Sequence, residues 1–296
     1  IKSISFENPI DSSNMNTTYY VDIAEIIEHN YNLYDGFVIL SGSDTMSYIS
    51  SAISFMLENL QKPVIFTGSQ LPIGDLRTDA KENLITSIEV ACTQKNGVPM
   101  IQEVCLYFEY KLYRANRTTK MSAEQFEAFV SMNYPPLAES GVYLKFNEHY
   151  LLNKSHIHSS FVVRKKLVTD IVILKMFPGI TKNVVESILN IQNLKGVVIE
   201  TFGSGNATIQ DWFLSELKKA QDNEIVILNV TQCLAGSVVQ GKYDTSSKFN
   251  DLGIVSGKDI TTEAAITKLM YVLAKYKYME EVKLKLSESF AGEMTL

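Results

Sequence analysis

Residues 35–46 read DGFVILSGSDTM, an apolar run that ends in a short, hydroxyl-rich turn. The apolar run at 37–40 is bounded by glycines and is typical of a buried strand. The mainly apolar stretch from Met46 to Leu60 predicts a helix that packs on this strand. In an open α/β sheet, the loop that leaves the carboxyl end of a strand faces the crevice in which ligands bind. Two serines, a threonine and a carboxylate at that place therefore predict a reaction centre.

Strand-like and helix-like segments alternate along the whole chain, which is typical of a mainly parallel sheet with covering helices. Further apolar runs that predict strands lie at 64–66, 104–108, 171–174, 196–199 and 225–230. We expect an α/β fold of two domains joined by a polar linker at 156–167. The N-terminal domain, 1–155, is expected to be the larger, with a mainly parallel sheet and covering helices. The smaller C-terminal domain, 168–296, is expected to be flavodoxin-like or Rossmann-like.

The composition excludes several classes of protein. The chain has 296 residues, of which 46% are hydrophobic and 20% charged, enough for a folded globule with a substantial core. Its net charge of −6 argues against a nucleic-acid partner, because phosphate binding needs a basic face. No apolar stretch approaches the roughly 20 residues that a membrane span needs, so we expect no membrane partner. Three cysteines without a C-x-x-C pair fit a reducing compartment, which predicts a cytoplasmic location.

Polar side chains also follow two later strands. Ser69 and Gln70 come after the run at 64–66, and Lys120 lies downstream of the run at 104–108. A hydroxyl is a poor nucleophile at neutral pH unless a base takes its proton. The four histidines fall in a helix-like segment or in the polar stretch before residue 168, which argues against a Ser-His-Asp triad. A hydroxyl–lysine–carboxylate arrangement remains, in which Asp44 orients Lys120 or anchors an ammonium group.

Each of these residues also has a simpler interpretation. Ser43 and Thr45 could cap the helix that follows them, which is the commonest use of hydroxyls at that position. Lys120 by itself could be an ordinary solvated lysine. His156 and His158 lie two residues apart, but no further ligands cluster near them in the sequence, so we expect no metal site.

Several motifs, in the same order along the chain, resemble those of the L-asparaginases of the cytoplasmic bacterial type. The matching segments lie at 11–15, 41–46, 62–70, 117–120 and 292–295, so the resemblance covers essentially the whole chain. Members of this family hydrolyse the side-chain amide of L-asparagine to L-aspartate and ammonia. They use two hydroxyls and a covalent acyl-enzyme intermediate, without a metal or organic cofactor. The resemblance therefore implies an amidohydrolase.

The resemblance also implies a role for individual residues. Ser43 stands where the family has its second catalytic threonine, and Asp44 and Lys120 complete that triad. The substrate-binding positions that the resemblance implies are Ser12 and Ser13 for the α-carboxylate, Asp44 for the α-ammonium group, Ser69 near the amide, and Asn206 reaching into a neighbouring subunit's site. Because family sites form at a dimer interface, we expect a homodimer or a dimer of dimers.

Two departures from the family pattern keep other functions open. Ser41 and Ser43 replace a histidine and a threonine of the signature. The Thr-Gly-Gly-Thr motif of the first strand, which holds the first catalytic threonine, is expected to precede Ile1. One alternative is a non-catalytic homologue that binds an amino acid, and another is the amidohydrolase subunit of a tRNA-dependent amidotransferase. The preference for asparagine over glutamine, allosteric regulation and the choice between dimer and tetramer stay open at this stage.

Overall fold

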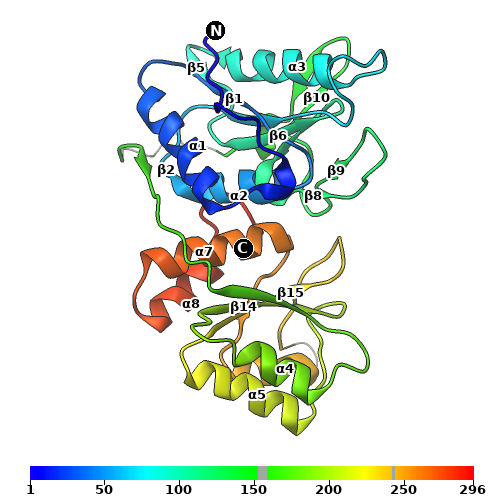
Figure 1. The fold of residues 1–296 in the computed structure, drawn as a ribbon, viewed down its shortest axis with the longest axis vertical. Helices are drawn as coiled ribbons and strands as arrows, with labels where there is room; N and C mark the ends of the chain where they lie inside the picture. Colours follow the sequence, from blue (N-terminus) through cyan, green and yellow to red (C-terminus); the bar gives the residue numbers. More distant parts are fainter. Residues whose placement is uncertain (153–158, 242–243) are drawn as a thin grey trace. The chain divides into compact units, whose positions relative to one another are not determined.

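The computed structural model describes residues 1–152, 159–241 and 244–296, and divides the chain into two compact units, 1–165 and 166–296. Each unit contains a sheet of its own with helices beside it (Figure 1). The predicted fold class, an α/β protein of two domains with a mainly parallel sheet in the first, is confirmed. The expected linker at 156–167 begins within 153–158, which lie outside the described residues.

The main sheet of the first unit is mainly parallel at the side that carries the predicted site. Its strand order is β1 (Phe37–Leu40), β3 (Val64–Thr67), β6 (Val104–Phe108), β7 (Lys111–Arg114), β10 (Ala138–Ser140) and β11 (Leu144–Phe146). The first three strands are parallel, and the next three are joined antiparallel. Every residue of β3 and β6 is buried, which explains why both read as continuous apolar runs.

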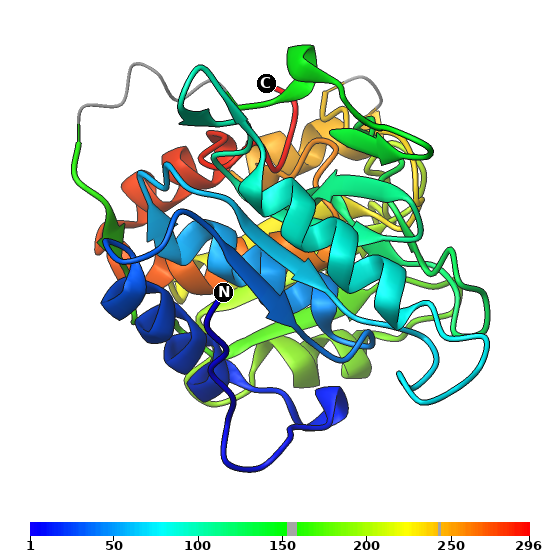
Figure 2. The ribbon, with the colours of Figure 1, turned by 90° about the horizontal axis from the view of Figure 1, so that it is seen from above.

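Helices cover both faces of this sheet. Helix α3 (Ala80–Cys92) lies on one face, and α1 (Thr17–Asn30) and α2 (Met46–Met56) lie on the other (Figures 1 and 2). Helix α1 begins after Asn16, whose side chain accepts a hydrogen bond from the backbone N–H of Thr18 at 2.9 Å. Helix α2 is buried on nearly all sides, in keeping with a sequence of apolar residues and small serines that carries no charge.

The predicted helix from Met46 to Leu60 is wrong at its C-terminal end. The helix ends at Met56, because the next two residues form β2 (Leu57–Glu58), which pairs antiparallel with β12 (Val162–Val163). Local periodicity carries no information about a pairing partner that lies so far along the chain. Both strands belong to the first unit.

Short elements complete the first unit. They are the hairpin strands β4 (Gln94–Lys95) and β5 (Val98–Pro99), the hairpin strands β8 (Thr119–Lys120) and β9 (Phe129–Val130), and the 3₁₀ turns η1 (Ser12–Asn14), η2 (Ala115–Arg117) and η3 (Glu148–Tyr150). Of these, η1 and β8 carry predicted site residues.

The second unit has a wholly parallel sheet in sequential strand order. Its strands are β13 (Ile171–Lys175), β14 (Gly196–Thr201), β15 (Val226–Thr231) and β16 (Val255–Ser256). Helices α4 (Lys182–Leu189) and α5 (Asp211–Asp222) cover one face, and α7 (Thr262–Lys275) and α8 (Met279–Ser287) cover the other (Figure 1). A further helix, α6 (Asp244–Asp251), precedes β16.

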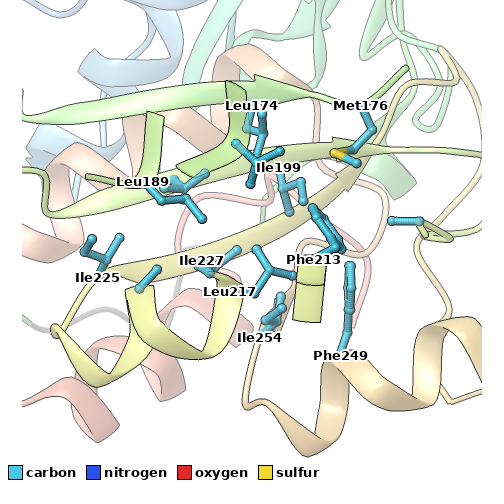
Figure 3. Packing of buried hydrophobic residues seen from close by; sticks show 14 of the residues in the cluster. Leu174, Met176, Leu189, Ile199, Phe213, Leu217, Ile225, Ile227, Phe249 and Ile254 are labelled. Carbon is cyan, nitrogen blue, oxygen red and sulfur yellow. The ribbon is translucent and has the colours of Figure 1, made fainter. Parts of the chain in front are cut away.

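The core of the second unit lies between its sheet and helices α4 and α5. Figure 3 shows Leu174, Ile199 and Ile227 of the strands beside Phe213 and Leu217 of α5. All five side chains are at most 2% exposed. Their burial supplies the apolar stabilisation that a parallel sheet needs on this face. In the part of the chain that the structure describes, no helix is both long and apolar enough to cross a membrane.

Candidate active site

The candidate site lies at the carboxyl ends of β1 and β3. Leu40 pairs with Thr67 in parallel register, so the loops that follow the two strands leave the same edge of the sheet. The N–H of Ser41 donates to the carbonyl oxygen of Thr67 at 2.9 Å. A Cβ atom at Gly68 would collide with the carbonyl oxygen of Ser41, so a glycine is needed where the two loops meet.

The three predicted catalytic residues come together at this edge. Lys120 on β8 directs its Nζ to Ser43 Oγ at 2.9 Å and to Asp44 Oδ1 at 2.6 Å. The side chain of Lys120 is 17% exposed and that of Asp44 is 66% exposed. Because the carboxylate is hydrated, this ion pair adds little to stability. It holds the lysine nitrogen beside the hydroxyl, which is the geometry that proton transfer between the two atoms requires.

Gln70 joins the site, and the sequence had given it no role there. Ser43 Oγ donates to Gln70 Oε1 at 3.2 Å, and Gln70 Nε2 donates to the carbonyl oxygen of Gln125 at 3.0 Å. Gln125 lies in the hairpin between β8 and β9, which also carries Lys120. The sequence signals for Gln70 were its place in the loop after the predicted strand at 64–66 and its membership of the matching segment 62–70.

The helix-capping interpretation does not describe these hydroxyls. Thr45 occupies the N-cap position of α2 but makes no side-chain capping bond; its hydroxyl donates to the carbonyl oxygen of Ser12 at 2.9 Å. Ser12 is buried, and a Cβ atom at Gly42 would lie 2.6 Å from both its Cβ and its Oγ. The turn around Ser12 therefore packs directly on the loop that carries Ser43.

The other predicted substrate-binding residues are placed as follows. Asp11 Oδ1 accepts hydrogen bonds from the N–H and Oγ of Ser13 at 2.9 and 2.8 Å, and these bonds lower the pKa of the exposed Asp11 carboxyl. Ser69 is part of the loop after β3, between Gly68 and Gln70. Asn206 belongs to the second unit, where its Nδ2 lies 3.4 Å from Ser204 Oγ.

Buried hydroxyls fix the segment that leads to Lys120. Thr118 is fully buried; its Oγ1 lies 3.0 Å from Ser47 Oγ of α2 and donates to the carbonyl oxygen of Ala115 at 2.7 Å. Asn116 Nδ2 donates to Ser54 Oγ, also on α2, at 3.0 Å. These bonds attach η2 to α2 and so determine where β8 begins.

No group of three or more His, Cys, Asp and Glu side chains in the described ranges is arranged to hold a metal ion. His156 and His158, which the sequence had raised as a metal pair and set aside, lie outside those ranges.

Comparison with known proteins identifies the family. A model described as "Asparaginase, N-terminal" matches residues 2–151, and one described as "Glutaminase/Asparaginase C-terminal domain" matches residues 170–284. The chain belongs to the asparaginase family. This result confirms the family that the motifs of the sequence had indicated.

Individual relatives agree with this family. L-asparaginase 1 of Escherichia coli K12 is 42% identical over 97% of this chain and 82% of the relative. The 60 kDa lysophospholipase of Mus musculus is 44% identical over 97% of this chain, which spans only 50% of that relative's length. The crystal structure of L-asparaginase I from Vibrio cholerae superimposes with a TM-score of 0.90 at 41% identity, covering 98% of this chain and 85% of that one. These similarities support the predicted enzyme class, an amidohydrolase.

Proposed function

We propose that this chain hydrolyses L-asparagine to L-aspartate and ammonia through a hydroxyl nucleophile and a covalent acyl-enzyme intermediate. The observation that carries the proposal is the contact of one lysine nitrogen with both a hydroxyl and a carboxylate. Lys120 Nζ lies 2.9 Å from Ser43 Oγ and 2.6 Å from Asp44 Oδ1. The similarity to L-asparaginase 1 supports asparagine as the substrate.

The proposed steps use these groups in order. After Lys120 Nζ gives up one proton to water, the Ser43 O–H turns from Gln70 Oε1 to this nitrogen, which takes the hydroxyl proton as Ser43 Oγ forms a bond to the side-chain carbonyl carbon of the substrate. The C–N bond then breaks, and the departing nitrogen takes the proton from Lys120 Nζ and leaves as ammonia. Water attacks the acyl carbon, releases aspartate and restores the hydroxyl. A positioned base of this kind typically contributes about 10²- to 10⁴-fold to the rate.

The rest of the proposed site binds the two charges of the amino acid. Asp44 keeps an exposed face on which it can bind the α-ammonium group while it contacts Lys120. Ser12 and Ser13 are proposed to bind the α-carboxylate, with the Ser13 hydroxyl turning from Asp11 Oδ1 to the substrate, and Ser69 is proposed to lie near the amide. Asn206 is proposed to act in the site of a neighbouring subunit, in a homodimer or a dimer of dimers.

Ammonia release from L-asparagine tests the proposal. The variants Ser43→Ala and Lys120→Met should each lower kcat by about 10²- to 10⁴-fold, because each removes one partner of the proton transfer. Lys165→Met is the matched control, since Lys165 is a surface lysine that pairs with Glu25 and Glu28 and should leave kcat unchanged. Equal activity of the wild type, Ser43→Ala and Lys120→Met would contradict the assignment.

The same assays separate the alternatives. A non-catalytic homologue would bind asparagine or aspartate and release no ammonia. An amidotransferase subunit would release ammonia effectively only in the presence of its partner subunit and charged tRNA. Hydrolysis of lysophosphatidylcholine is measured in parallel, because one relative is named a lysophospholipase and this chain spans half of it. Glutamine is measured beside asparagine to establish the substrate preference.

A further inference from the structure

Asp79 stands at the N-cap position of α3 but does not cap its own helix. Its carboxylate turns to the loop after β3 instead. Oδ2 accepts from the N–H of Gln70 at 2.9 Å, and Oδ1 accepts from the N–H groups of Gln70 and Leu71, both at 3.1 Å. The residue is 8% exposed, so these charge-assisted bonds form away from bulk water.

Two further residues around the start of α3 hold the same loop. Asn83 is fully buried; its Nδ2 donates to the carbonyl oxygen of Gly68 at 3.0 Å and to Asp79 Oδ2 at 3.2 Å. Thr78 Oγ1 donates to the carbonyl oxygen of Leu71 at 3.0 Å. The backbone of residues 68–71 is therefore fixed to α3 at three of its four residues.

This anchorage reaches the candidate nucleophile through one side chain. Gln70 accepts the Ser43 hydroxyl at 3.2 Å and donates to the carbonyl oxygen of Gln125 at 3.0 Å. Its amide thus joins the loop that carries Ser43 to the hairpin that carries Lys120. The 3.2 Å contact is a long hydrogen bond, so its geometry depends on where the Gln70 backbone is held.

We propose that Asp79 is a positioning residue for the hydrolysis proposed above. By holding the backbone of Gln70, it fixes the acceptor that keeps Ser43 Oγ in place beside Lys120 Nζ and the donor that holds the hairpin of Lys120. The inference rests on the proposed function, and it assigns to a buried carboxylate a role that acts through Gln70. A displacement of reacting groups of about 1 Å can cost about 100-fold in rate.

The test compares two equally buried aspartates. Asp79→Asn keeps the size of the side chain but turns an amide nitrogen toward N–H donors; kcat should fall about 10- to 100-fold with a smaller change in KM. Asp259 is the matched control: it is also 8% exposed, and it accepts from the N–H and Oγ1 of Thr295, both at 2.7 Å. Asp259→Asn should lower Tm and leave kcat unchanged. Equal kcat values for the two variants would overturn the proposal.

A double-mutant cycle shows whether the effect passes through Gln70. Gln70→Leu removes the side-chain amide and should lower kcat by itself. If Asp79 acts through that amide, kcat of the double variant is no lower than kcat of the more impaired single variant. A fall in kcat of the double variant equal to the product of the falls in the two single variants would overturn the proposal. If Asp79→Asn does not fold, Asp79→Glu replaces it in the cycle, because it keeps a carboxylate but moves it relative to the N–H groups of Gln70 and Leu71.

Hydrogen exchange separates a failure of this inference from a failure of the proposed function. The amides of Gln70 and Leu71 should exchange faster in Asp79→Asn than in the wild type, whatever the reaction. A wild type that releases no ammonia defeats the proposed function, and the cycle is then measured with aspartate affinity. Unchanged exchange of both amides overturns the inference even in an active enzyme.

Discussion

At the scale of single residues, Ser43 is the position where this chain departs from the family signature and still forms the expected contacts. A serine lacks the β-methyl group that restricts χ1 in threonine, so its hydroxyl has more rotational freedom. In the structure, the hydroxyl is held by Lys120 and by Gln70. Two hydrogen bonds thus replace part of the restriction that a methyl group would impose.

The variant Ser43→Thr should therefore remain active and should raise kcat for asparagine modestly, by about two- to tenfold. Restricting one side-chain torsion is worth on the order of 1 kcal/mol, which corresponds to a few-fold in rate. Ammonia release under saturating asparagine measures the effect. An inactive parent with an active variant would contradict the view that Ser43 keeps the chemistry.

Gly42 offers a second prediction at the same scale. In Gly42→Ala, the new Cβ would lie 2.6 Å from Ser12 Cβ and Oγ and would displace the side chain proposed to bind the α-carboxylate. Loss of a hydrogen bond to a charged group costs about 1.5–3 kcal/mol, so KM for asparagine should rise at least about tenfold with kcat less affected. Gly141→Ala is the control, because nothing lies within 4 Å of a Cβ built there. Unchanged KM in Gly42→Ala would count against the role of Ser12.

At the scale of elements, a buried ion pair attaches the β6–β7 hairpin to the chain near residue 150. The pair joins Arg114 of β7 to Glu103, which directly precedes β6. Arg114 Nε lies 2.5 Å from Glu103 Oε2, and each side chain is 3% exposed. Glu103 Oε1 also accepts from the N–H of Leu152 at 2.8 Å, and Arg114 Nη2 donates to the carbonyl oxygen of Tyr150 at 2.9 Å. The carboxylate therefore serves as a common partner for two segments.

Removing one partner leaves the other as an uncompensated buried charge. Glu103→Ala should lower the free energy of unfolding by about 3–5 kcal/mol, measured by urea denaturation. Glu148→Ala is the matched comparison: its pair with Lys95 is more than half exposed on both sides, and its loss should cost less than about 1 kcal/mol. A similar decrease in the free energy of unfolding in the two variants would show that the buried pair stabilises the fold no more than the exposed pair does.

At the scale of the whole molecule, the three proposed catalytic residues and the Asp79 anchorage all belong to the first unit. The stability of that unit should therefore set the conditions under which the site exists. Tyr20 and Tyr113 belong to the same unit and are 8% and 6% exposed. Burial raises the pKa of each phenol to about 12.

Stability should consequently fall in alkaline solution. The folded state keeps phenol protons that the unfolded chain releases near pH 10, so the stabilisation is complete below about pH 10 and is lost as the pH rises toward about 12. Each tyrosine should contribute a slope of about 1.4 kcal/mol per pH unit over that range. Urea denaturation at several pH values measures the slope, and Tyr113→Phe should reduce it. Phenolate absorbance that rises fully near pH 10 without loss of fold would contradict this prediction.

The sequence by itself determined the fold class, the strands that hold the site and the family. Buried parallel strands read as short apolar runs, and loops that follow such strands meet at one edge of a sheet, so polar residues after them could be grouped without coordinates. Ser43, Asp44 and Lys120 were found in this way and by their motifs. The sequence did not reveal where α2 ends or that β2 pairs antiparallel with β12.

Only the tertiary structure decided how the site is held together. The bond from Lys120 to Ser43 joins residues 77 positions apart, and the bond from Gln70 to Gln125 spans 55. Asp79 stands at the N-cap position of α3, yet its carboxylate binds another loop. The direction of a side chain is chosen by the packing of segments distant in the chain, and such packing leaves no periodic trace in the local sequence.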